Sequence, residues 1–207
     1  EIYKFAEEYN LRVIEDAAHA FGSKYKSRNI GSIGDICCFS FDGIKNITCG
    51  EGGCIVTSDN VVLEKIKDSR LLGIKKESEN KYVGKRNWFY DVSEQGYRHH
   101  MSDIFASIGL SQLKRLDQFK KKRYDLVCYY VKLLRQESVK LIANIDHEET
   151  MAHIFPIILE EGVDRIKLKE KLFKRGIETG FHYFPNHKLT FYRDNKAKEL
   201  KITEKIY

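Results

Sequence analysis

An aspartate and a lysine each follow a short apolar run of the kind that forms a buried parallel strand. Asp16 comes directly after the run at 11–15 (LRVIE), and Lys45 comes soon after the run at 36–41 (ICCFSF). Ligands of open α/β sheets bind at the carboxyl ends of the strands, and a lysine held in a cleft can form a Schiff base. Taken singly, Asp16 is more simply a turn residue or helix N-cap, and Lys45 an ordinary exposed loop lysine.

Considered together, these residues match the needs of one cofactor, pyridoxal phosphate. Ser40 lies within the second run, and glycines at 50, 52 and 53 let the backbone approach a ligand closely. An aspartate keeps the pyridine nitrogen of this cofactor protonated, so that the ring accepts electrons, and a lysine holds its aldehyde as an imine. Asp16, Ser40 and Lys45 therefore predict a cofactor site. His19 alone would more often satisfy a backbone group than bind a ligand.

The surrounding pattern predicts the elements that must hold these residues. Apolar, β-branched runs predict strands at 11–15, 36–41 and 53–57. Apolar residues at helical spacing predict helices at 1–10, at 60–72 and at 102–134, with Ser102 as an N-cap. Strands that alternate with helices favour an α/β layer architecture. A later strand at 152–159, a helix at 164–175 and a strand at 177–184 predict a smaller α+β domain.

The composition excludes several classes of protein. Of the 207 residues, 42% are hydrophobic and 12% aromatic, too many for a disordered chain. The apolar runs are too short to cross a bilayer and none lies at the N-terminus, so we expect neither a membrane span nor a signal peptide. The five cysteines form no CxxC pair, so we predict no metal site and a reduced, cytoplasmic protein.

One long stretch of the chain closely resembles a known family. Residues 13–53 (VIEDAAHAFGSKYKSRNIGSIGDICCFSFDGIKNITCGEGG) resemble the DegT/DnrJ/EryC1/StrS family of pyridoxal-phosphate-dependent aminotransferases, which act on nucleotide-linked keto sugars. Residues 96–117 (GYRHHMSDIFASIGLSQLKRLD) and 176–187 (GIETGFHYFPNH) resemble the later blocks of the family, in the same order. The resemblance implies an α/β, aspartate aminotransferase-like fold (fold type I), with a partial large domain and a smaller α+β C-terminal domain.

The resemblance also implies roles for the four residues of the first block. Lys45 would form the imine with the cofactor and move the proton between the donor carbon and the cofactor. Asp16 would pair with the pyridinium nitrogen, and His19 would contact the phenolic oxygen of the ring. Ser40 would bind the cofactor phosphate. The presence of Lys45 favours amino transfer over the sugar deoxygenation that members with a histidine at this position carry out.

The later blocks add candidates of a second kind. Where relatives usually offer an asparagine that reaches the cofactor phosphate of the partner subunit, this chain has Arg98, His99 and His100. Either Arg98 or His100 would supply the contact by charge. The alternative is that this segment is ordinary surface. His182, Tyr183 and His187 lie in a GxHYxPxH-like block that faces the sugar in the family. For each of them, a strand with packed aromatic residues is an equally good interpretation.

By the same resemblance, the domains would comprise 1–95 (part of the cofactor-binding large domain), 96–136 (connecting helices) and 137–207 (part of the small domain). Residue 1 is not Met, and the N-terminal part and C-terminal end of the family have no counterpart here. We therefore expect an internal piece of a longer protein that binds pyridoxal phosphate poorly by itself. We also expect a homodimer; the long polar stretch 73–95, with Trp88 and Tyr90, is the only feature of the sequence itself that supports one.

The predicted reaction is transamination of a nucleotide-linked keto sugar, with L-glutamate as the amino acid donor, in the biosynthesis of a polysaccharide or related glycan. Two other functions stay open: a catalytically silent sensor or regulator that keeps the fold, and a basic nucleic-acid-binding module. The second depends on the net charge of +6 and on the run at 120–123 (KKKR). Against it, the chain has no interleaved aromatic platform, so we expect no nucleic-acid partner.

Overall fold

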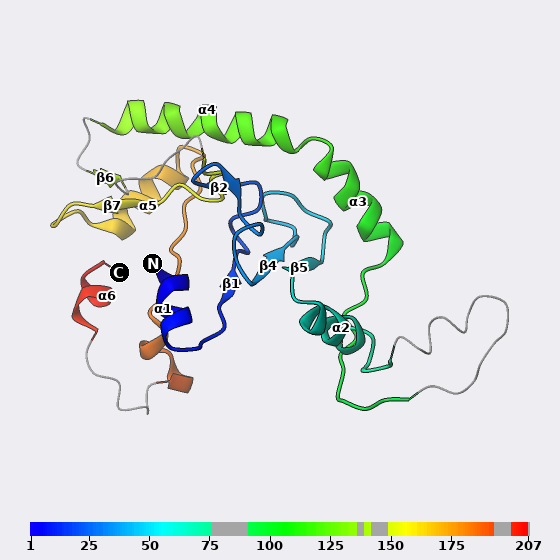
Figure 1. The fold of residues 1–207 in the computed structure, drawn as a ribbon. Helices are drawn as coiled ribbons and strands as arrows, with labels where there is room; N and C mark the ends of the chain where they lie inside the picture. The colour runs from blue at the N-terminus through cyan, green and yellow to red at the C-terminus, as the bar shows by residue number, and fades with distance from the viewer. Residues whose placement is uncertain (76–90, 136–138, 142–148, 193–199, 207) are drawn as a thin grey trace. The chain divides into compact units, whose positions relative to one another are not determined.

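The computed structural model describes residues 1–75, 91–135, 139–141, 149–192 and 200–206. These residues form two compact units. Unit 1 comprises Glu1–Tyr130 and Ile145–Phe155, and unit 2 comprises Val131–Asn144 and Pro156–Tyr207. The structure is mixed α/β, as predicted (Figure 1). The division at 95 and 136 stays a prediction. Trp88 and Tyr90 lie outside the described residues.

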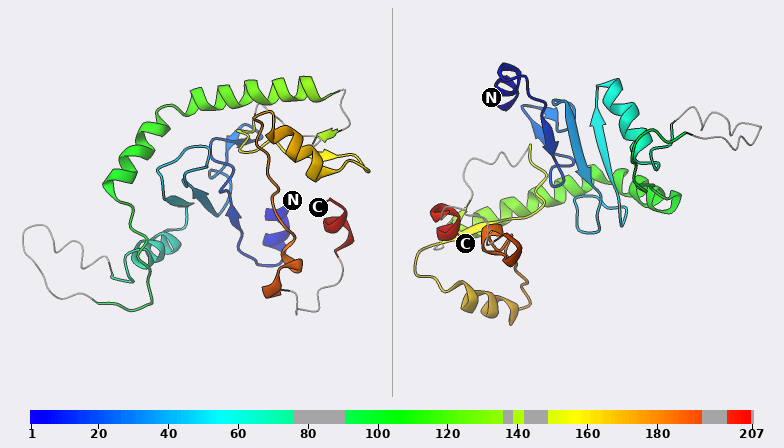
Figure 2. Two further views of the ribbon diagram at one scale, coloured as in Figure 1. Left: turned by 180° about the vertical axis from the view of Figure 1, so that it is seen from behind. Right: turned by 90° about the horizontal axis from the view of Figure 1, so that it is seen from below.

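The sheet of unit 1 has three strands in the order β1-β4-β5, which lie side by side in Figure 2. Strand β1 (Ile14–Asp16) is parallel to β4 (Ile36–Ser40), and β5 (Gly53–Thr57) is antiparallel to β4. The continuous apolar run of β4 suits a central strand, which is covered on both faces. The core cluster forms on it, from Ala17, Cys37 and Phe39.

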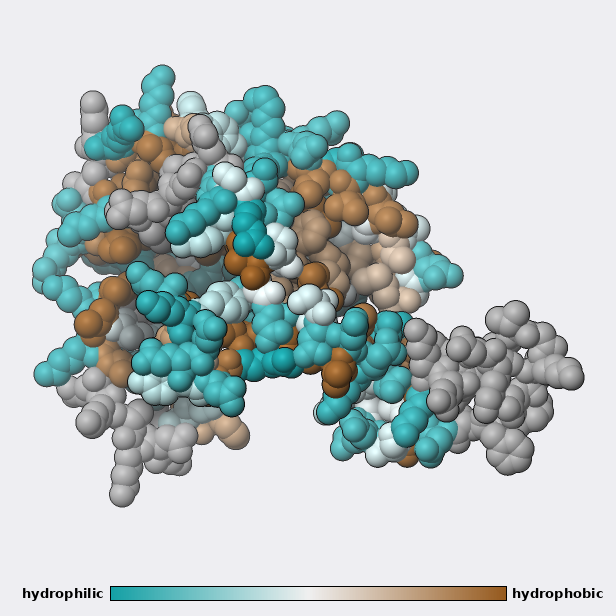
Figure 3. Space-filling view, in the orientation of Figure 1, coloured by the Kyte–Doolittle hydropathy of each residue, from teal (hydrophilic) through white to brown (hydrophobic). Residues whose placement is uncertain are grey.

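The prediction that the first strand is buried was wrong. Within the described residues, β1 pairs only with β4 and is therefore an edge strand, and Ile14 is 66% exposed. Other large apolar side chains are also exposed, and Figure 3 shows hydrophobic residues in brown on the face that it displays.

The helices of unit 1 lie at the predicted positions, but the single helix predicted at 102–134 is two helices, which a turn at 114–115 separates. They are α1 (Ile2–Glu8), α2 (Asn60–Ser69), α3 (Asp103–Leu113) and α4 (Leu116–Leu134), the last of which continues into unit 2. The predicted N-cap of α3 is confirmed, because the Ser102 side chain accepts a hydrogen bond from the Phe105 amide. Asp59 caps α2 in the same way. No helix in the part of the chain that the structure describes is both long and apolar enough to cross a bilayer.

A short hairpin that the sequence pattern does not indicate connects β1 to β4. Its strands are β2 (Lys24–Tyr25) and β3 (Arg28–Asn29), which pair antiparallel. Lys26 and Ser27 in its turn both have positive φ angles, 49° and 63°. This backbone usually selects Gly or Asn, so neither residue type predicts the turn.

Unit 2 contains the antiparallel pair β6 (Val139–Leu141) and β7 (Ile157–Leu159), helix α5 (Arg165–Phe173), the 3-10 turns η2 (Asn186–Lys188) and η3 (Thr190–Tyr192), and α6 (Lys201–Ile206). Two strand predictions need correction here. Of 152–159, only Ile157–Leu159 is a strand, and 177–184 forms none. A strand requires a hydrogen-bonding neighbour, and no described segment pairs with 177–184.

Candidate cofactor site

Asp16 and Ser40 are the last residues of two neighbouring parallel strands. The register pairs Asp16 with Cys38, so β1 and β4 end at the same edge of the sheet. The Asp16 side chain is exposed there, and its Oδ1 accepts a hydrogen bond from the Ala18 amide at 3.1 Å. The half-buried Ser40 accepts one from the Asp42 amide at 3.4 Å. A carboxylate and a hydroxyl therefore share the edge at which ligands of such sheets bind.

Lys45 lies in the loop that leaves this edge and returns as β5. The loop is closed by its own hydrogen bonds, from the Phe41 amide to the Gly52 carbonyl at 2.8 Å and from the Cys49 amide to the Phe41 carbonyl at 2.9 Å. The Lys45 amide itself donates to the Asp42 carbonyl at 3.0 Å. The half-buried Lys45 is thus held on a short, internally bonded loop rather than on a free one.

Glycine is required where this loop rejoins the sheet. A Cβ at Gly53 would lie 2.6 Å from the Phe39 carbonyl oxygen on β4, and a Cβ at Gly52 would lie 2.6 Å from the Cys49 sulfur. A side chain at Gly53 would therefore push β5 away from β4, and one at Gly52 would displace the Cys49 thiol within the loop that carries Lys45.

His19 follows β1 in a turn closed by the hydrogen bond from the Ala20 amide to the Ala17 carbonyl. Its ring is in contact with the ring of His153, with 4.1 Å between centroids and 37° between planes. His153 is not among the residues that the sequence indicates. Nothing in the spacing of the sequence connects position 153 with position 19, because the contact is made only by the fold.

The thiols of Cys37, Cys49 and Cys54, which are buried or half-buried near this edge, do not supply a nucleophile. Burial, with the nearby Glu15 carboxylate as a second cause, raises the pKa of Cys37 to about 12. Burial also raises the pKa of Cys49 and of Cys54. These thiols therefore stay protonated at neutral pH. The described residues also contain no group of three or more His, Cys, Asp or Glu side chains that could hold a metal ion.

Arg98 and His100 lie in the exposed segment before α3. This segment contacts the end of α2: Arg98 forms a bridge with Leu71, and the amide of the intervening His99 donates to the Arg70 carbonyl at 3.0 Å. The structure therefore places them beside α2, and their role at a phosphate stays a prediction.

The three residues predicted to face the sugar belong to unit 2. His182 and Tyr183 are exposed, and their rings contact each other at 4.5 Å between centroids. His187 Nε2 lies 3.2 Å from a Glu204 carboxylate oxygen, and Lys188 Nζ lies 2.7 Å from the other. Hydrogen bonds from Lys188 and His187 lower the pKa of the Glu204 carboxyl. His187 is thus fixed by α6, whereas His182 and Tyr183 are presented to solvent.

The basic run on α4 is not a uniform charged surface. Lys121 pairs with Asp125 at 2.7 Å, and the Arg123 guanidinium donates to the Ala152 carbonyl at 2.8 Å. Arg123 thus binds backbone within unit 1, so its donors are not all available to an external ligand.

The groups at the sheet edge fit pyridoxal phosphate chemically. An exposed carboxylate, a hydroxyl and an amine on a constrained loop suit the pyridinium nitrogen, the phosphate and the aldehyde of this cofactor. The structure brings Asp16, Ser40 and the Lys45 loop to one edge and adds His19 in the next turn.

Solved structures with a similar fold include sugar aminotransferases that bind this cofactor. Helicobacter pylori PseC, an aminotransferase of pseudoaminic acid biosynthesis, matches with a TM-score of 0.88 and 28% identity, over 99% of this chain and 54% of that one. The putative sugar aminotransferase Spr1654 from Streptococcus pneumoniae, solved with pyridoxal phosphate, matches with a TM-score of 0.79 and 28% identity, over 97% and 50%. Spr1654 has also been solved in its pyridoxamine phosphate form, so both forms of the cofactor occur in this fold.

Curated sequences give the same result. A UDP-4-amino-4,6-dideoxy-N-acetyl-beta-L-altrosamine transaminase from Campylobacter jejuni is 36% identical over 196 residues, which are 93% of this chain and 50% of that protein. The spore coat polysaccharide biosynthesis protein SpsC from Bacillus subtilis is 36% identical over 198 residues, 93% of this chain and 51% of SpsC. The chain thus spans about half the length of the curated relatives it matches. The model of the DegT/DnrJ/EryC1/StrS aminotransferase family matches residues 1–207, and the chain belongs to this family.

Proposed function

We propose that the complete protein transfers an amino group from an amino acid, L-glutamate, to a nucleotide-linked keto sugar, with pyridoxal phosphate as cofactor. The observation that carries the proposal is the shared sheet edge, where Asp16 and Ser40 end adjacent parallel strands and the Lys45 loop continues from the second of them. Family membership supports the reaction class. The similarity to the Campylobacter relative, a transaminase of a UDP-linked amino sugar, supports the substrate class.

The bound cofactor supplies an electron-accepting ring. The Asp16 carboxylate would keep the ring nitrogen protonated, and the Ser40 hydroxyl would donate a hydrogen bond to the phosphate. Lys45 would hold the aldehyde until the amino acid displaces it, and its Nζ would then accept the proton from the donor carbon and return it at the cofactor. The loop's own hydrogen bonds, including that of the Lys45 amide, hold the backbone from which this side chain extends, and so limit the region that its amine can reach.

The remaining residues would serve substrate and assembly. We assign Arg98 and His100 to the cofactor phosphate of a partner subunit, in a cytoplasmic homodimer. We assign His182, Tyr183 and His187 to the sugar. The support is chemical: the first two carry or can carry positive charge, and the latter three offer exposed rings or a histidine braced by Glu204.

The deciding experiment is an absorbance spectrum of the complete protein with pyridoxal phosphate, before and after L-glutamate is added. We expect a visible band that L-glutamate converts to the band of the pyridoxamine form. Lys45→Ala should abolish the visible band and turnover. Lys65→Ala, which removes an exposed lysine from α2, is the matched control and should change neither.

Each failure has a definite meaning. An active Lys45→Ala variant would refute the role of this lysine. A bound cofactor that does not respond to L-glutamate would refute the donor, and absence of turnover with every amino acid tried would favour a silent regulator. Salt-dependent DNA binding without any effect of pyridoxal phosphate would favour the nucleic-acid alternative.

A further inference from the structure

A segment distant in the sequence, residues 149–153, is bound along the chain that connects β1 to β4. The Glu149 carbonyl accepts the Lys24 amide at 2.8 Å, and the Glu149 carboxylate accepts the amides of Lys26 and Ser27 in the hairpin turn. Both turn residues have positive φ, so the carboxylate stabilises a backbone that these residue types do not favour. We call residues 149–153 the strap.

The middle of the strap is buried in unit 1. Met151 is only 1% exposed, and its amide donates to the Ser23 hydroxyl at 2.9 Å. The Arg123 guanidinium on α4 donates to the next two carbonyls, of Ala152 at 2.8 Å and His153 at 3.4 Å. Hydrogen bonds from two directions therefore fix the strap, although it forms no regular secondary structure.

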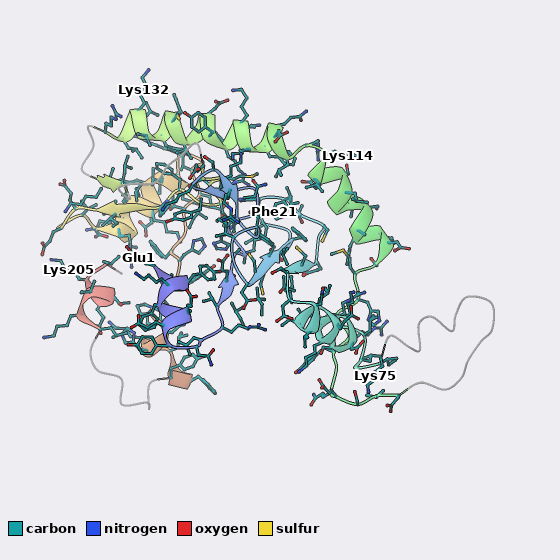
Figure 4. All side chains as sticks on the ribbon, in the orientation of Figure 1. Glu1, Phe21, Lys75, Lys114, Lys132 and Lys205 are labelled. Atoms are coloured by element: carbon teal, nitrogen blue, oxygen red, sulfur yellow. The ribbon has the colours of Figure 1, made fainter. Side chains whose placement is uncertain are left out.

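Asn46 connects the strap to the loop of the candidate cofactor site. It follows Lys45 directly and is 6% exposed. Its Nδ2 donates to the Met151 carbonyl at 2.9 Å and to the Phe21 carbonyl at 3.1 Å. Two carbonyl acceptors fix the orientation of the amide, because the reverse orientation would point its oxygen at both. The ring of Phe21, labelled in Figure 4, packs edge-to-face on Phe41, where this loop begins.

At its other end the strap reaches His19. The rings of His153 and His19 contact at 4.1 Å between centroids, and Arg123 holds the backbone of His153. His153 therefore limits the directions that the exposed His19 ring can take. The strap contacts both the lysine-bearing loop and the turn that follows Asp16.

We propose that the strap orients the cofactor site, with Asn46 positioning Lys45 and His153 positioning His19. The inference rests on the proposed function, since it assigns these residues to pyridoxal phosphate through Lys45 and His19. The reason is preorganisation: a group held in place before the ligand arrives loses little conformational freedom when the ligand binds. Asn46 and His153 do not contact the cofactor in this proposal and act only through their neighbours.

The first test uses Asn46→Ala in the complete protein, freed of cofactor and titrated with pyridoxal phosphate. Loss of the two hydrogen bonds from Asn46 should raise the Kd for the cofactor about tenfold. Asn29→Ala, which removes an exposed amide on β3, is the control and should stay within about twofold of the unchanged protein. The melting temperature of the cofactor-free protein, measured in parallel, separates loss of fold from loss of orientation.

The second test changes His153, whose ring contacts His19, and so does not require removal of the buried Asn46 amide. His153→Ala should raise the Kd about fivefold and shift the visible band of the bound cofactor, while His153→Phe keeps a ring against His19 and should restore the affinity. Phe155→Ala is the matched control. Phe155 lies two residues after His153, and its ring stacks on Tyr130, with 5.0 Å between centroids, rather than on His19. It should lower the melting temperature and leave the Kd unchanged.

The outcomes distinguish this inference from the proposed function. If Asn46→Ala and His153→Ala lower the melting temperature but leave the Kd and the visible band unchanged, the strap is only structural and the inference is wrong. If the unchanged protein binds pyridoxal phosphate but transfers no amino group, the proposed function fails while the Kd ratios still decide the inference. If the unchanged protein binds no pyridoxal phosphate, both are wrong.

Discussion

The contact between Gly22 and Met151 offers a quantitative test of how tightly the strap is packed. Gly22 has a φ of +83°, and a Cβ built on it would lie 2.5 Å from the Met151 sulfur and 3.3 Å from a methyl carbon of Leu116. Because Met151 is 1% exposed, its thioether has little room to move aside. Gly22→Ala should therefore impose both a backbone strain and a steric clash, whereas Met151→Ala should leave a cavity.

The magnitudes follow from these two terms. A left-handed φ at a residue with a Cβ costs about 1–2 kcal/mol, and overpacking a rigid site adds about 1–3 kcal/mol. Truncation of a buried methionine to alanine costs about 2–5 kcal/mol. In the double variant the sulfur that causes the clash is gone, so the backbone strain and the cost of the Met151 truncation remain but the clash does not. The double variant should thus be more stable than the sum of the two single effects predicts, by about 1–3 kcal/mol.

The assay is urea unfolding of the complete protein, followed by circular dichroism, for the four members of this double-mutant cycle. Gly162→Ala is the control for the strain alone, because Gly162 has a φ of +91° and its Cβ would meet nothing within 4 Å. It should cost only the strain of about 1–2 kcal/mol. Additive single effects, within about 0.5 kcal/mol, would refute the packing of Met151 against Gly22.

Two further predictions follow from the charged and thiol groups. Hydrogen bonds from the Val62 amide and from Arg12 lower the pKa of Asp59, so this carboxylate stabilises the fold above its ordinary pKa, and the contribution is lost as the pH falls through the lower pKa of the folded state. Asp59→Asn keeps an N-cap acceptor but removes the charge. The melting temperature of this variant should lie below that of the unchanged protein at neutral pH, and the difference should vanish in acid. A difference that does not depend on pH would contradict this. Burial raises the pKa of Cys37 to about 12, whereas Cys128 is exposed. Iodoacetamide should therefore label Cys128 in the folded protein and Cys37 only after unfolding, which mass spectrometry can measure. Equal labelling rates for the two cysteines in the folded protein would contradict the burial of Cys37.

Local sequence patterns correctly predicted two strands and one helix cap. The run at 36–41 is strand Ile36–Ser40, and the run at 53–57 is a strand at those residues. Ser102 caps α3 as its position predicted, because an N-cap requires only a hydroxyl and the amides that follow it. The cap is made by neighbouring residues, and each of the two strands finds its partner in the other, because Ile36–Ser40 and Gly53–Thr57 pair antiparallel across a short loop.

The predictions that failed depend on a partner elsewhere in the chain. The apolar pattern at 177–184 resembles a strand, but pattern alone does not provide a neighbour to pair with. Ile14 has the apolar character of a buried strand residue and is 66% exposed, because β1 lies at the edge of the described sheet. The turn at Lys26 and Ser27 depends on a carboxylate more than a hundred positions later, which no local propensity indicates.

The candidate site likewise contains residues that the local sequence indicates and residues that only the fold brings to it. Asp16, Ser40 and Lys45 could be predicted because two successive parallel strands bring their ends together, and each residue type has a direct chemical use there. Asn46 and His153 could not, because an asparagine beside a lysine and a histidine in an apolar run have no distinctive chemistry of their own. The roles proposed for them rest on contacts distant in the sequence: between Asn46 and Met151, which are 105 positions apart, and between the rings of His19 and His153. If the strap orients the site, a change of residue type at 46 or 153 should alter cofactor affinity while every residue of the recognisable motif stays in place, and the motif alone would then overestimate how well such a chain binds its cofactor.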